Sequence, residues 1–214
     1  MAITINGSGT ITGISQGGLP DDCVDNDTLA NSSVTVNGTS IALGGSDTIS
    51  AGKVLQVVST NYDTVYTANP TSWSDVSGFS ASITPSSTSN KILVIVHVVL
   101  GSEQWGGIRV VESTDSDRVV GAGDSANLGS RQDGGLFNAV NIYNHLNSEA
   151  TSIQSAHVLD SPASTSTVTY QLQSVGRWGS TTYYTSINRP YSWNNDSISG
   201  RITSSNITLM EIGA

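Results

Sequence analysis

The chain has 214 residues, which is enough for one substantial domain with appendages, since single domains usually contain roughly 100 to 200 residues. Only 12% of the residues are charged, and 8 basic against 17 acidic residues give a net charge of −9, so a basic surface for a phosphate backbone is excluded and nucleic acid is not an expected partner. The abundance of Ser, Thr, Asn, Gly and β-branched residues favours short strands and turns, and the chain is predicted to be mainly β.

The redox and membrane signals of the chain are few. Cys23 is the single cysteine, so no intrachain disulfide is expected, which is consistent with folding in a reducing cytosol. Residues 1–7 contain neither a basic region nor an apolar run, and we expect no secretory signal. No apolar segment approaches the ~20 residues of a membrane helix, so membrane insertion is not expected.

Residues 1–52 are predicted to form an extended N-terminal segment. They contain no aromatic residue, no Lys and no Arg, and their scattered apolar side chains are too few to offset the entropy of ordering the chain. We expect short extended pieces at 3–5 and 10–14 and one short helix at 24–30. Ordered structure in this segment requires contacts with other chains, and the apolar residues proposed to dock on a partner are Ile3, Ile5, Ile11, Ile14 and Leu19.

Within this segment, residues 33–46 predict a β-hairpin. Two runs of alternating apolar and polar residues flank Asn37-Gly38, the dipeptide most typical of a tight hairpin turn. An isolated two-stranded hairpin is marginally stable, so we expect it to pack against its own copies or against a neighbouring protein. Residues 45–53 are interpreted as a linker.

Residues 53–214 predict an antiparallel β-sandwich knob. Short runs of strand-forming residues recur every 8 to 12 residues or so, separated by Gly, Pro, Asn and Ser, and a jelly roll of two packed sheets is the preferred architecture. The predicted strands are 54–59, 64–67, 76–84, 92–100, 107–112, 118–121, 136–143, 152–160, 167–175, 181–187, 197–203 and 206–212.

The strand at 92–100 is predicted to be the centre of the knob and to be buried on both faces, because its residues are apolar on both. One cover is the partner sheet, and another subunit is a candidate for the second. On this interpretation Val94, Val96 and Val98 are the candidate residues of a trimer interface. His97 in the same run could be a metal ligand or pH-sensitive group, but a histidine hydrogen-bonded within a core or interface is the more frequent case.

Four stretches of the chain match the pattern of a known family. They are Gly-Gly-Leu-Pro-Asp at 17–21, the run 34–49 with its Val-Asn-Gly-Thr-Ser core, the run 55–100, and the closing Ser-Asn-Ile-Thr-Leu-Met-Glu-Ile at 205–212. With these residues the chain resembles the short tail-fibre proteins of marine bacteriophages, in particular of cyanophages. The family often has Tyr-Ile-Asn-Arg-Ser before its last strands, whereas this chain has Ser-Ile-Asn-Arg-Pro at 186–190, so the turn there departs from the family's pattern.

The resemblance implies a homotrimeric virion protein that is assembled in the host cytoplasm and located on the tail. Its N-terminal segment, residues 1–52, would dock on tail or adaptor proteins, and its C-terminal knob, residues 53–214, would contact a glycan or protein on the host surface. The coreless N-terminal segment and the apolar central strand fit this implication, because both require contacts between subunits.

Aromatic residues in loops of the knob suggest where a host receptor would bind. Aromatic side chains flanked by Asn, Asp and Arg can give a sugar ring a flat apolar face and hydrogen bonds. The alternative, which weighs more for any single tryptophan, is that these rings close the ends of the sandwich or fill the subunit interface. The candidate receptor-binding residues are Trp105, Arg177, Trp178, Tyr183, Tyr184, Tyr191 and Trp193.

Catalytic and metal-binding motifs are weak. Residues 13–17 match Gly-x-Ser-x-Gly but lack the flanking strand and helix of a nucleophile elbow, and Gly121-x-Gly123 lacks the helix of a dinucleotide site. The aspartates between 21 and 27 could offer oxygen ligands to calcium, yet they lack the EF-hand glycine and glutamate, so a solvated loop is preferred. The three histidines have no zinc spacing and the four glutamates no glycosidase motif. Neither an enzyme, a metal nor a cofactor is expected.

Two alternatives of other classes stay open. A capsid decoration protein or head fibre would use the same knob on a different docking surface. A non-viral carbohydrate-binding module would be monomeric and would bury its central strand without a partner.

Overall fold

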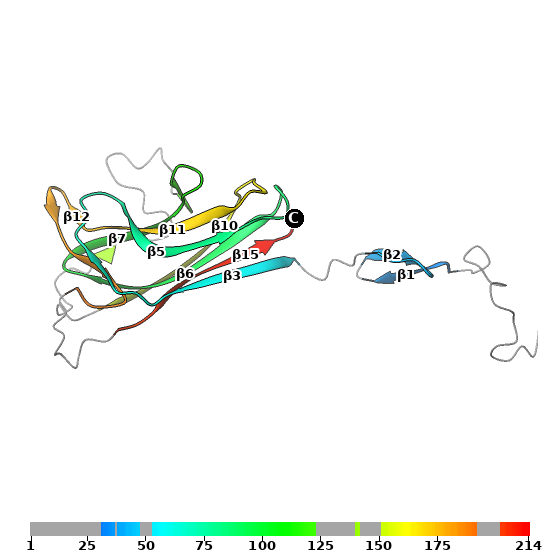
Figure 1. The fold of residues 1–214 in the computed structure, drawn as a ribbon, viewed down its shortest axis with the longest axis horizontal. Helices are drawn as coiled ribbons and strands as arrows, with labels where there is room; N and C mark the ends of the chain where they lie inside the picture. Colours follow the sequence, from blue (N-terminus) through cyan, green and yellow to red (C-terminus); the bar gives the residue numbers. More distant parts are fainter. Residues whose placement is uncertain (1–30, 37, 48–52, 123–139, 142–150, 192–201) are drawn as a thin grey trace, which may run out of the picture. The chain divides into compact units, whose positions relative to one another are not determined.

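The computed structural model describes residues 31–36, 38–47, 53–122, 140–141, 151–191 and 202–214 (Figure 1). All regular secondary structure in these residues is β-strand, and all strand pairs are antiparallel, so the predicted all-β class is confirmed. The chain divides into two compact units, Met1–Ala51 and Gly52–Ala214. The second unit contains the predicted knob.

The predicted N-terminal hairpin is present. β1 (Ser33–Val36) pairs with β2 (Thr39–Ala42), and Val34 lies opposite Ile41. Gly38 in the turn has a φ of 82°, a conformation that glycine adopts without steric cost. Val34 is 52% exposed, so the apolar face of the hairpin has no cover within the described residues. The predicted helix at 24–30 and the docking residues Ile3 to Leu19 lie outside the described residues.

The knob is built from two facing sheets. Sheet I has the order β3–β15–β6, with β10 on the other edge of β6; β14 pairs with the end of β6 beyond β15, and β4 pairs with β14. Its strands are β3 (Val54–Tyr62), β4 (Tyr66–Ala68), β6 (Lys91–Ser102), β10 (Ser152–Asp160), β14 (Thr185–Ile187) and β15 (Ser205–Ile212). Along the chain, the long strands of this sheet alternate with the long strands of a second sheet that faces it.

Sheet II has the order β5–β11–β7–β8, and β9 pairs with the beginning of β7. A separate two-stranded hairpin, β12–β13, follows β11. The strands are β5 (Ser74–Ile83), β7 (Trp105–Glu112), β8 (Arg118–Val119), β9 (Val140–Asn141), β11 (Val168–Val175), β12 (Arg177–Trp178) and β13 (Thr181–Thr182).

Most predicted strands overlap an observed one, and the differences lie at the loops. Of the predicted strand 136–143 only β9 is described, and of 197–203 only residues 202 and 203, which are not in a strand. β12 was not predicted. β6 extends to Ser102, beyond its predicted end.

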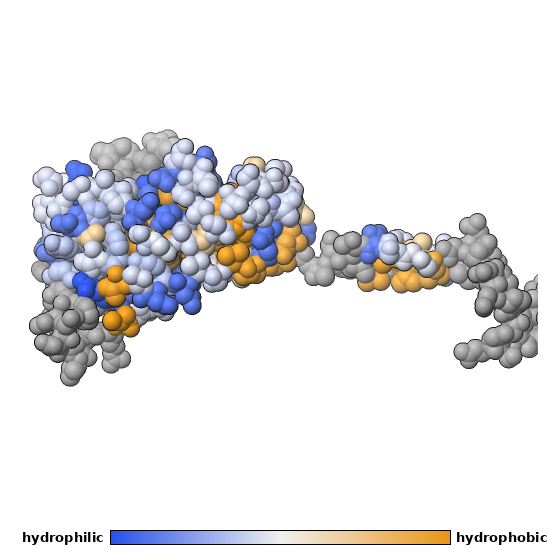
Figure 2. Space-filling model, in the orientation of Figure 1, coloured by the Kyte–Doolittle hydropathy of each residue, from blue (hydrophilic) through white to orange (hydrophobic). Residues whose placement is uncertain are grey.

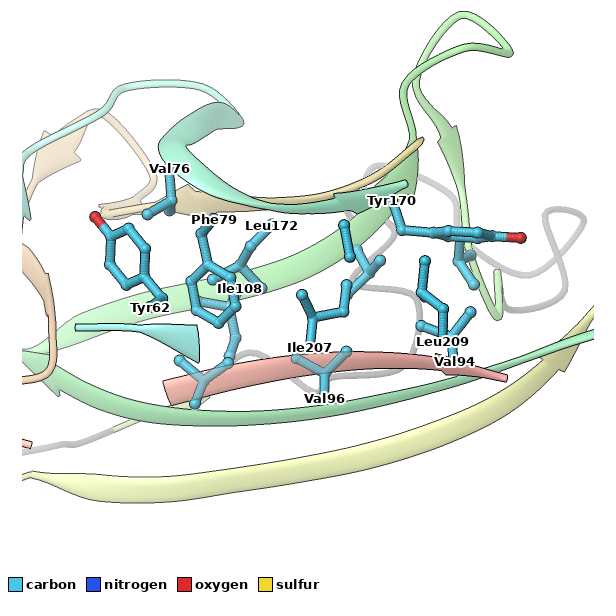
Figure 3. Close-up of a cluster of buried hydrophobic side chains, with 14 of the residues drawn as sticks. Tyr62, Val76, Phe79, Val94, Val96, Ile108, Tyr170, Leu172, Ile207 and Leu209 are labelled. Carbon is cyan, nitrogen blue, oxygen red and sulfur yellow. The ribbon is translucent and has the colours of Figure 1, made fainter. Parts of the chain in front are cut away.

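One hydrophobic core fills the space between the sheets (Figure 3). β6 and β15 contribute Val94, Val96, Ile207 and Leu209 from sheet I, and sheet II contributes residues such as Phe79, Ile108, Tyr170 and Leu172, all fully buried. The rings of Tyr62 and Phe79 stack across the sheets, with centroids 4.7 Å apart. Since each fully buried side chain of this size contributes about 1.5–3 kcal/mol, this core is the main source of the stability of the knob.

The burial of β6 corrects the predicted interface. Val94, Val96 and Val98 are fully buried inside one chain, so a second copy has no exposed area of theirs to cover. The alternate residues Leu93 and Ile95 face outward and are half-buried, and both faces are buried only from residue 99 onward. The sequence could not distinguish the two faces because both are apolar. His97 is also on the outer face, where its Nδ1 lies 2.9 Å from the Ser155 hydroxyl, as the hydrogen-bonded interpretation expected.

A buried carboxylate holds the 84–90 loop on sheet I. Glu211 on β15 is 1% exposed and accepts hydrogen bonds from Gln56 Nε2, Asn90 Nδ2, and the backbone N–H and hydroxyl of Ser86, at 2.6 to 2.7 Å. Burial by itself would raise the pKa of Glu211, but the donors from Asn90, Gln56 and Ser86 outweigh it and lower the pKa from 4.5 to about 2. The ionised form is therefore the one that fits this site.

This network predicts an acid-dependent loss of stability. Because the folded-state pKa of Glu211 is lower than its ordinary value, its contribution to the free energy of unfolding is present above about pH 4.5 and is lost as the pH falls towards 2. Glu211→Gln should cost about 1–3 kcal/mol at pH 7, since an amide cannot accept all of these donors. Urea unfolding at several pH values measures both. If the free energy of unfolding of wild type and variant fell equally steeply between pH 4.5 and 2, the low pKa assigned to Glu211 would be contradicted.

Candidate functional site

The knob has two ends, because the long strands of both sheets run between them (Figure 1). One end, which we call the base, carries the beginning of β3, the end of β15 and the loops 84–90, 113–117 and 161–167. The opposite end, which we call the aromatic end, carries the segments 69–73, 103–104, 176–184 and 188–191. The aromatic end contains most of the predicted receptor-binding residues.

Backbone hydrogen bonds tie three segments of the aromatic end together. The N–H of Glu103 donates to the carbonyl of Tyr184 at 3.0 Å, and the N–H of Tyr184 reaches the Glu103 carboxylate at 3.3 Å. Gly176 donates to the Pro70 carbonyl at 3.0 Å and accepts from Tyr183 at 2.7 Å. The loops that carry the aromatic residues are therefore fixed relative to one another.

Gly176 is required by the close approach of two chain segments. A Cβ atom at this position would lie 1.9 Å from the carbonyl oxygen of Tyr183, far inside van der Waals contact. The next residue, Arg177, continues the same connection: its Nε donates to the Gly179 carbonyl at 2.5 Å and its Nη1 to the Thr71 carbonyl at 3.3 Å. The β12–β13 hairpin is therefore positioned by backbone contacts and by the Arg177 side chain.

The structure places five of the seven predicted receptor-binding side chains. Arg177 is exposed, Tyr184 is 47% exposed, and the remaining three, Trp105, Tyr183 and Tyr191, are half-buried. Trp178 has its backbone in β12, and Trp193 lies outside the described residues. Partly buried rings beside an exposed guanidinium can offer a flat apolar face and charged hydrogen-bond donors to a ligand. The same partial burial also fits the alternative in which the rings close the end of the sandwich.

The sequence did not single out Trp73, which lies on the outer face of sheet II near this end. The guanidinium of Arg109 lies 4.6 Å from the centroid of its ring, a cation–π contact. Arg109 Nε donates to Gln173 Oε1 at 2.8 Å, and Gln173 Nε2 donates to Asp75 at 2.9 Å and to Asp117 at 3.3 Å. These partners come from three strands and two connecting segments that are distant in the sequence, so only the strand pairing, which the sequence does not show, could have revealed the cluster.

The base carries an ion cluster around Arg118. Its guanidinium donates to Asp160 at 2.8 and 2.9 Å, to Glu112 at 3.1 Å and to Asp115 at 3.1 Å. The side chains of Glu112 and Asp160 are 4% and 8% exposed, whereas that of Asp115 is 62% exposed. The hydroxyl of Tyr170 also donates to Asp160, at 2.8 Å. The cluster joins four strands at one corner of the sandwich.

The protonation of this cluster follows from its contacts. Burial alone would raise the pKa of Asp160, but the hydrogen bonds from Arg118 and Tyr170 outweigh it and lower the pKa. The hydrogen bond to Asp160 raises the pKa of Arg118, and burial, together with the negative charge of Asp160, raises that of Tyr170. Asp160 is therefore ionised, and both Arg118 and Tyr170 are protonated, at neutral pH.

A pocket of about 210 Å³ opens beside the cluster. Two carboxylates, several hydroxyls and two apolar residues line it: Glu112, Thr114, Asp115, Pro162, Ser164, Ser166, Thr167 and Val168. Both oxygens of Glu112 are already engaged, one by the Thr114 hydroxyl and one by Arg118. This carboxylate of the pocket lining therefore serves the fold, because it balances the Arg118 charge.

Two further properties concern the described ranges as a whole. Within them, no group of three or more His, Cys, Asp or Glu side chains is arranged to hold a metal ion. The same ranges contain no helix with the length and apolar character needed to cross a membrane.

Comparisons with known proteins give little further guidance. No protein-family model matches the chain, and no curated protein matches it. Among solved structures, the chain is similar to VP2 in a subviral particle of infectious bursal disease virus, with 11% identity and a TM-score of 0.30. The match covers 84% of this chain and 45% of that chain, so this chain spans less than half the length of VP2. At this level of similarity the match identifies neither a family nor a function.

The Arg118 cluster predicts unequal effects of two substitutions. Arg118→Met should lower the free energy of unfolding by about 2–3 kcal/mol, because it leaves two buried carboxylates without their counter-charge. This is less than for a fully buried pair, since the Arg118 side chain is 35% exposed. Asp115→Asn, at the exposed arm, should cost less than about 0.5 kcal/mol. Denaturant unfolding at one fixed chain concentration measures both, and similar costs for the two variants would contradict this account.

Proposed function

We propose that this chain is a structural, non-enzymatic virion protein: a short bacteriophage tail fibre that attaches to the tail by its N-terminal segment and contacts the host surface with its knob. The observation that carries the proposal is that the two ends of the knob differ in what they contain. The chain enters the knob at the base, through β3, and the grouped aromatic and arginine residues lie at the opposite end. A receptor-binding protein needs this separation between attachment and recognition.

The strand order supports a jelly roll. The long strands form two sheets, β3–β15–β6–β10 and β5–β11–β7–β8, and the first and last strands of the knob are neighbours. The chain crosses from one sheet to the other between β3 and β5, β5 and β6, and β6 and β7. Double-sheet folds of this kind occur in viral capsid and lectin domains, so the fold suits both a virion protein and a sugar-binding one.

The N-terminal hairpin supports a homotrimer. Its apolar face, with Val34 and Val36 at 52% and 39% exposed, cannot be left in water by a hairpin that has only two strands. Residues 31–47 contain no basic residue and only Asp47 as an acid, so three copies could pack around an axis without strong charge repulsion. We assign this role, and docking on tail or adaptor proteins, to residues 1–52.

The proposed ligand at the aromatic end is a host surface glycan or a protein of the host surface. Tyr184 offers an exposed ring and hydroxyl, and Arg177 offers a charge that suits acidic sugars. Weak binding at each site suffices, because several sites on one particle raise the avidity by orders of magnitude. The virion would be assembled in the host cytoplasm.

A capsid decoration or head fibre would use the same knob, and the position on the particle separates the two roles. Immunogold labelling of virions with an antibody to the knob should mark the tail. Label on the head would replace the tail-fibre assignment by the alternative, and no label on any virion would favour the non-viral carbohydrate-binding module.

The receptor role of the aromatic end predicts an adsorption defect. Virions that carry Arg177→Ala together with Tyr184→Ala should adsorb to host cells at least about tenfold more slowly, because each loss is multiplied over the copies on a particle. Thr88→Ala, an exposed loop residue at the base, is the control and should leave adsorption unchanged. Both preparations must contain equal amounts of the fibre. Normal adsorption of the double variant would reject the receptor site at this end.

A further inference from the structure

The outer face of sheet I carries an apolar patch at the base (Figure 2). The pairing register places Leu159, Leu93, Met210 and Val57 side by side in one row across four strands. Ile212 and Val54 form part of the row closer to the base, and Ile95 follows in the next row. Val54, Val57 and Leu159 are 53%, 53% and 52% exposed. These seven residues are the base patch: Val54, Val57, Leu93, Ile95, Leu159, Met210 and Ile212.

We propose that the base patch is the surface by which the knobs of neighbouring copies of this chain meet. The proposal rests on the proposed homotrimer and names its interface in the knob. It replaces the buried Val94, Val96 and Val98 by residues of the opposite face of the same sheet. The occupant of the patch is the corresponding patch of the other copies, which meet around the axis of the trimer.

The absence of charge at the patch favours a copy of the same chain. The chain carries a net charge of −9, so most of its surface repels a second copy. None of the seven patch residues is charged. In the register Lys91 lies beside Ile212 and donates to Ser161 at 2.6 Å, and His157 lies beside Ile95. Two copies can therefore approach through this face without bringing like charges together.

The size of the patch indicates how strongly the knobs associate. Each residue on one face of a sheet occupies roughly 33 Å² of its plane, so seven residues cover roughly 230 Å². Stable interfaces bury about 800 Å² on each partner. The patch alone is too small for a stable dimer of knobs, but it is sufficient to add to an association that is already held elsewhere.

We assign to the N-terminal hairpin the contact that holds the copies together before their knobs meet. Its apolar face and the base patch are uncovered surfaces of the same chain, and association between copies covers both. β3 begins with Val54, only a short linker after the hairpin in sequence, so copies that meet at their hairpins hold the first residues of their β3 strands at high local concentration. A weak contact between knobs then forms readily.

Lysine substitutions in the full-length chain test the proposal. Val57→Lys combined with Leu159→Lys should raise the concentration at which trimers dissociate by about tenfold or more, as measured by light scattering over a dilution series. The control is Ile153→Lys: Ile153 is 66% exposed on the same face of the same strand as Leu159 but lies at its other end, and this variant should dissociate like wild type. Since all three positions are exposed, the variants should fold like wild type and give the same circular dichroism spectrum.

Spin labels identify the occupant. In a Cys23→Ser background, labels at Val57→Cys should give shorter distances between copies than labels at Ile153→Cys. Longer distances at position 57, or lysine variants that assemble like wild type, would overturn the base patch while leaving the trimer intact. Such a result would arise if a hairpin or a tail protein covered the patch. A monomeric wild-type chain would overturn the homotrimer and the base patch together.

Discussion

The knob depends on the burial of one face of β6. This strand pairs along both edges, with β10 on one side and with β15 and β14 on the other, and its inner face packs on sheet II. Val94, Val96, Val98 and Leu100 are fully buried, so each contributes close to the full free energy of removing its surface from water. Because β6 fixes the positions of its neighbours in sheet I, it also fixes the outer face that forms the base patch.

The alternation of side chains along a strand links the core to the outer surface. Residues one apart on β6 face opposite sides, so the same register that buries Val94 and Val96 places Leu93 and Ile95 outside. A polar outer face would be expected if the sheet met only water. The outer face is polar in its middle, where His97, Asn206 and Asn61 lie in one row, and apolar at the base. Ile153 is also exposed at the other end of this face, but at the base apolar residues from four strands lie in adjoining rows, and this is why we assign contacts between copies to the base.

Local signals in the sequence predicted the local structure well. Asn37-Gly38 predicted the turn of the hairpin, and the β-branched run at 92–100 predicted the central strand. The partners of the strands could not be predicted, because they lie far apart in the chain: Ile207 of β15 pairs with Val96 of β6. The inner and outer faces of β6 could not be distinguished from the sequence either, since both are apolar and no alternation of polar residues marks the side that meets water.

The candidate site could also be predicted only in part, because its contacts join segments that are distant in the sequence. The sequence indicated that aromatic residues of the loops are functional candidates, and the structure brings Trp105, Arg177, Tyr183 and Tyr184 to one end through contacts between their loops. Trp73 was missed because Arg109, which lies over its ring, belongs to a distant strand and is itself held by Gln173 of the neighbouring strand β11.

The buried position of Glu211 could not be predicted from the sequence, because it depends on the contact of β15 with the loop at 84–90. Its donors come from β3 and from this loop, both distant in sequence from β15. What the sequence could not show in each case was a contact between distant segments.

The two ends of the knob are stabilised by different interactions, and this difference fits their proposed roles. At the base, the buried carboxylates of Glu211 and Asp160 accept hydrogen bonds from several donors. Movement of the backbone around them would break these hydrogen bonds and lower the free energy of unfolding. At the aromatic end, the segments are joined by backbone hydrogen bonds, by the close contact at Gly176 and by the exposed Arg177 side chain, and the exposed Tyr184 ring lies outside any buried network. Substitution of an exposed side chain such as Tyr184 should cost little stability, so under the proposed roles the recognition surface could change with the host while the base stays fixed.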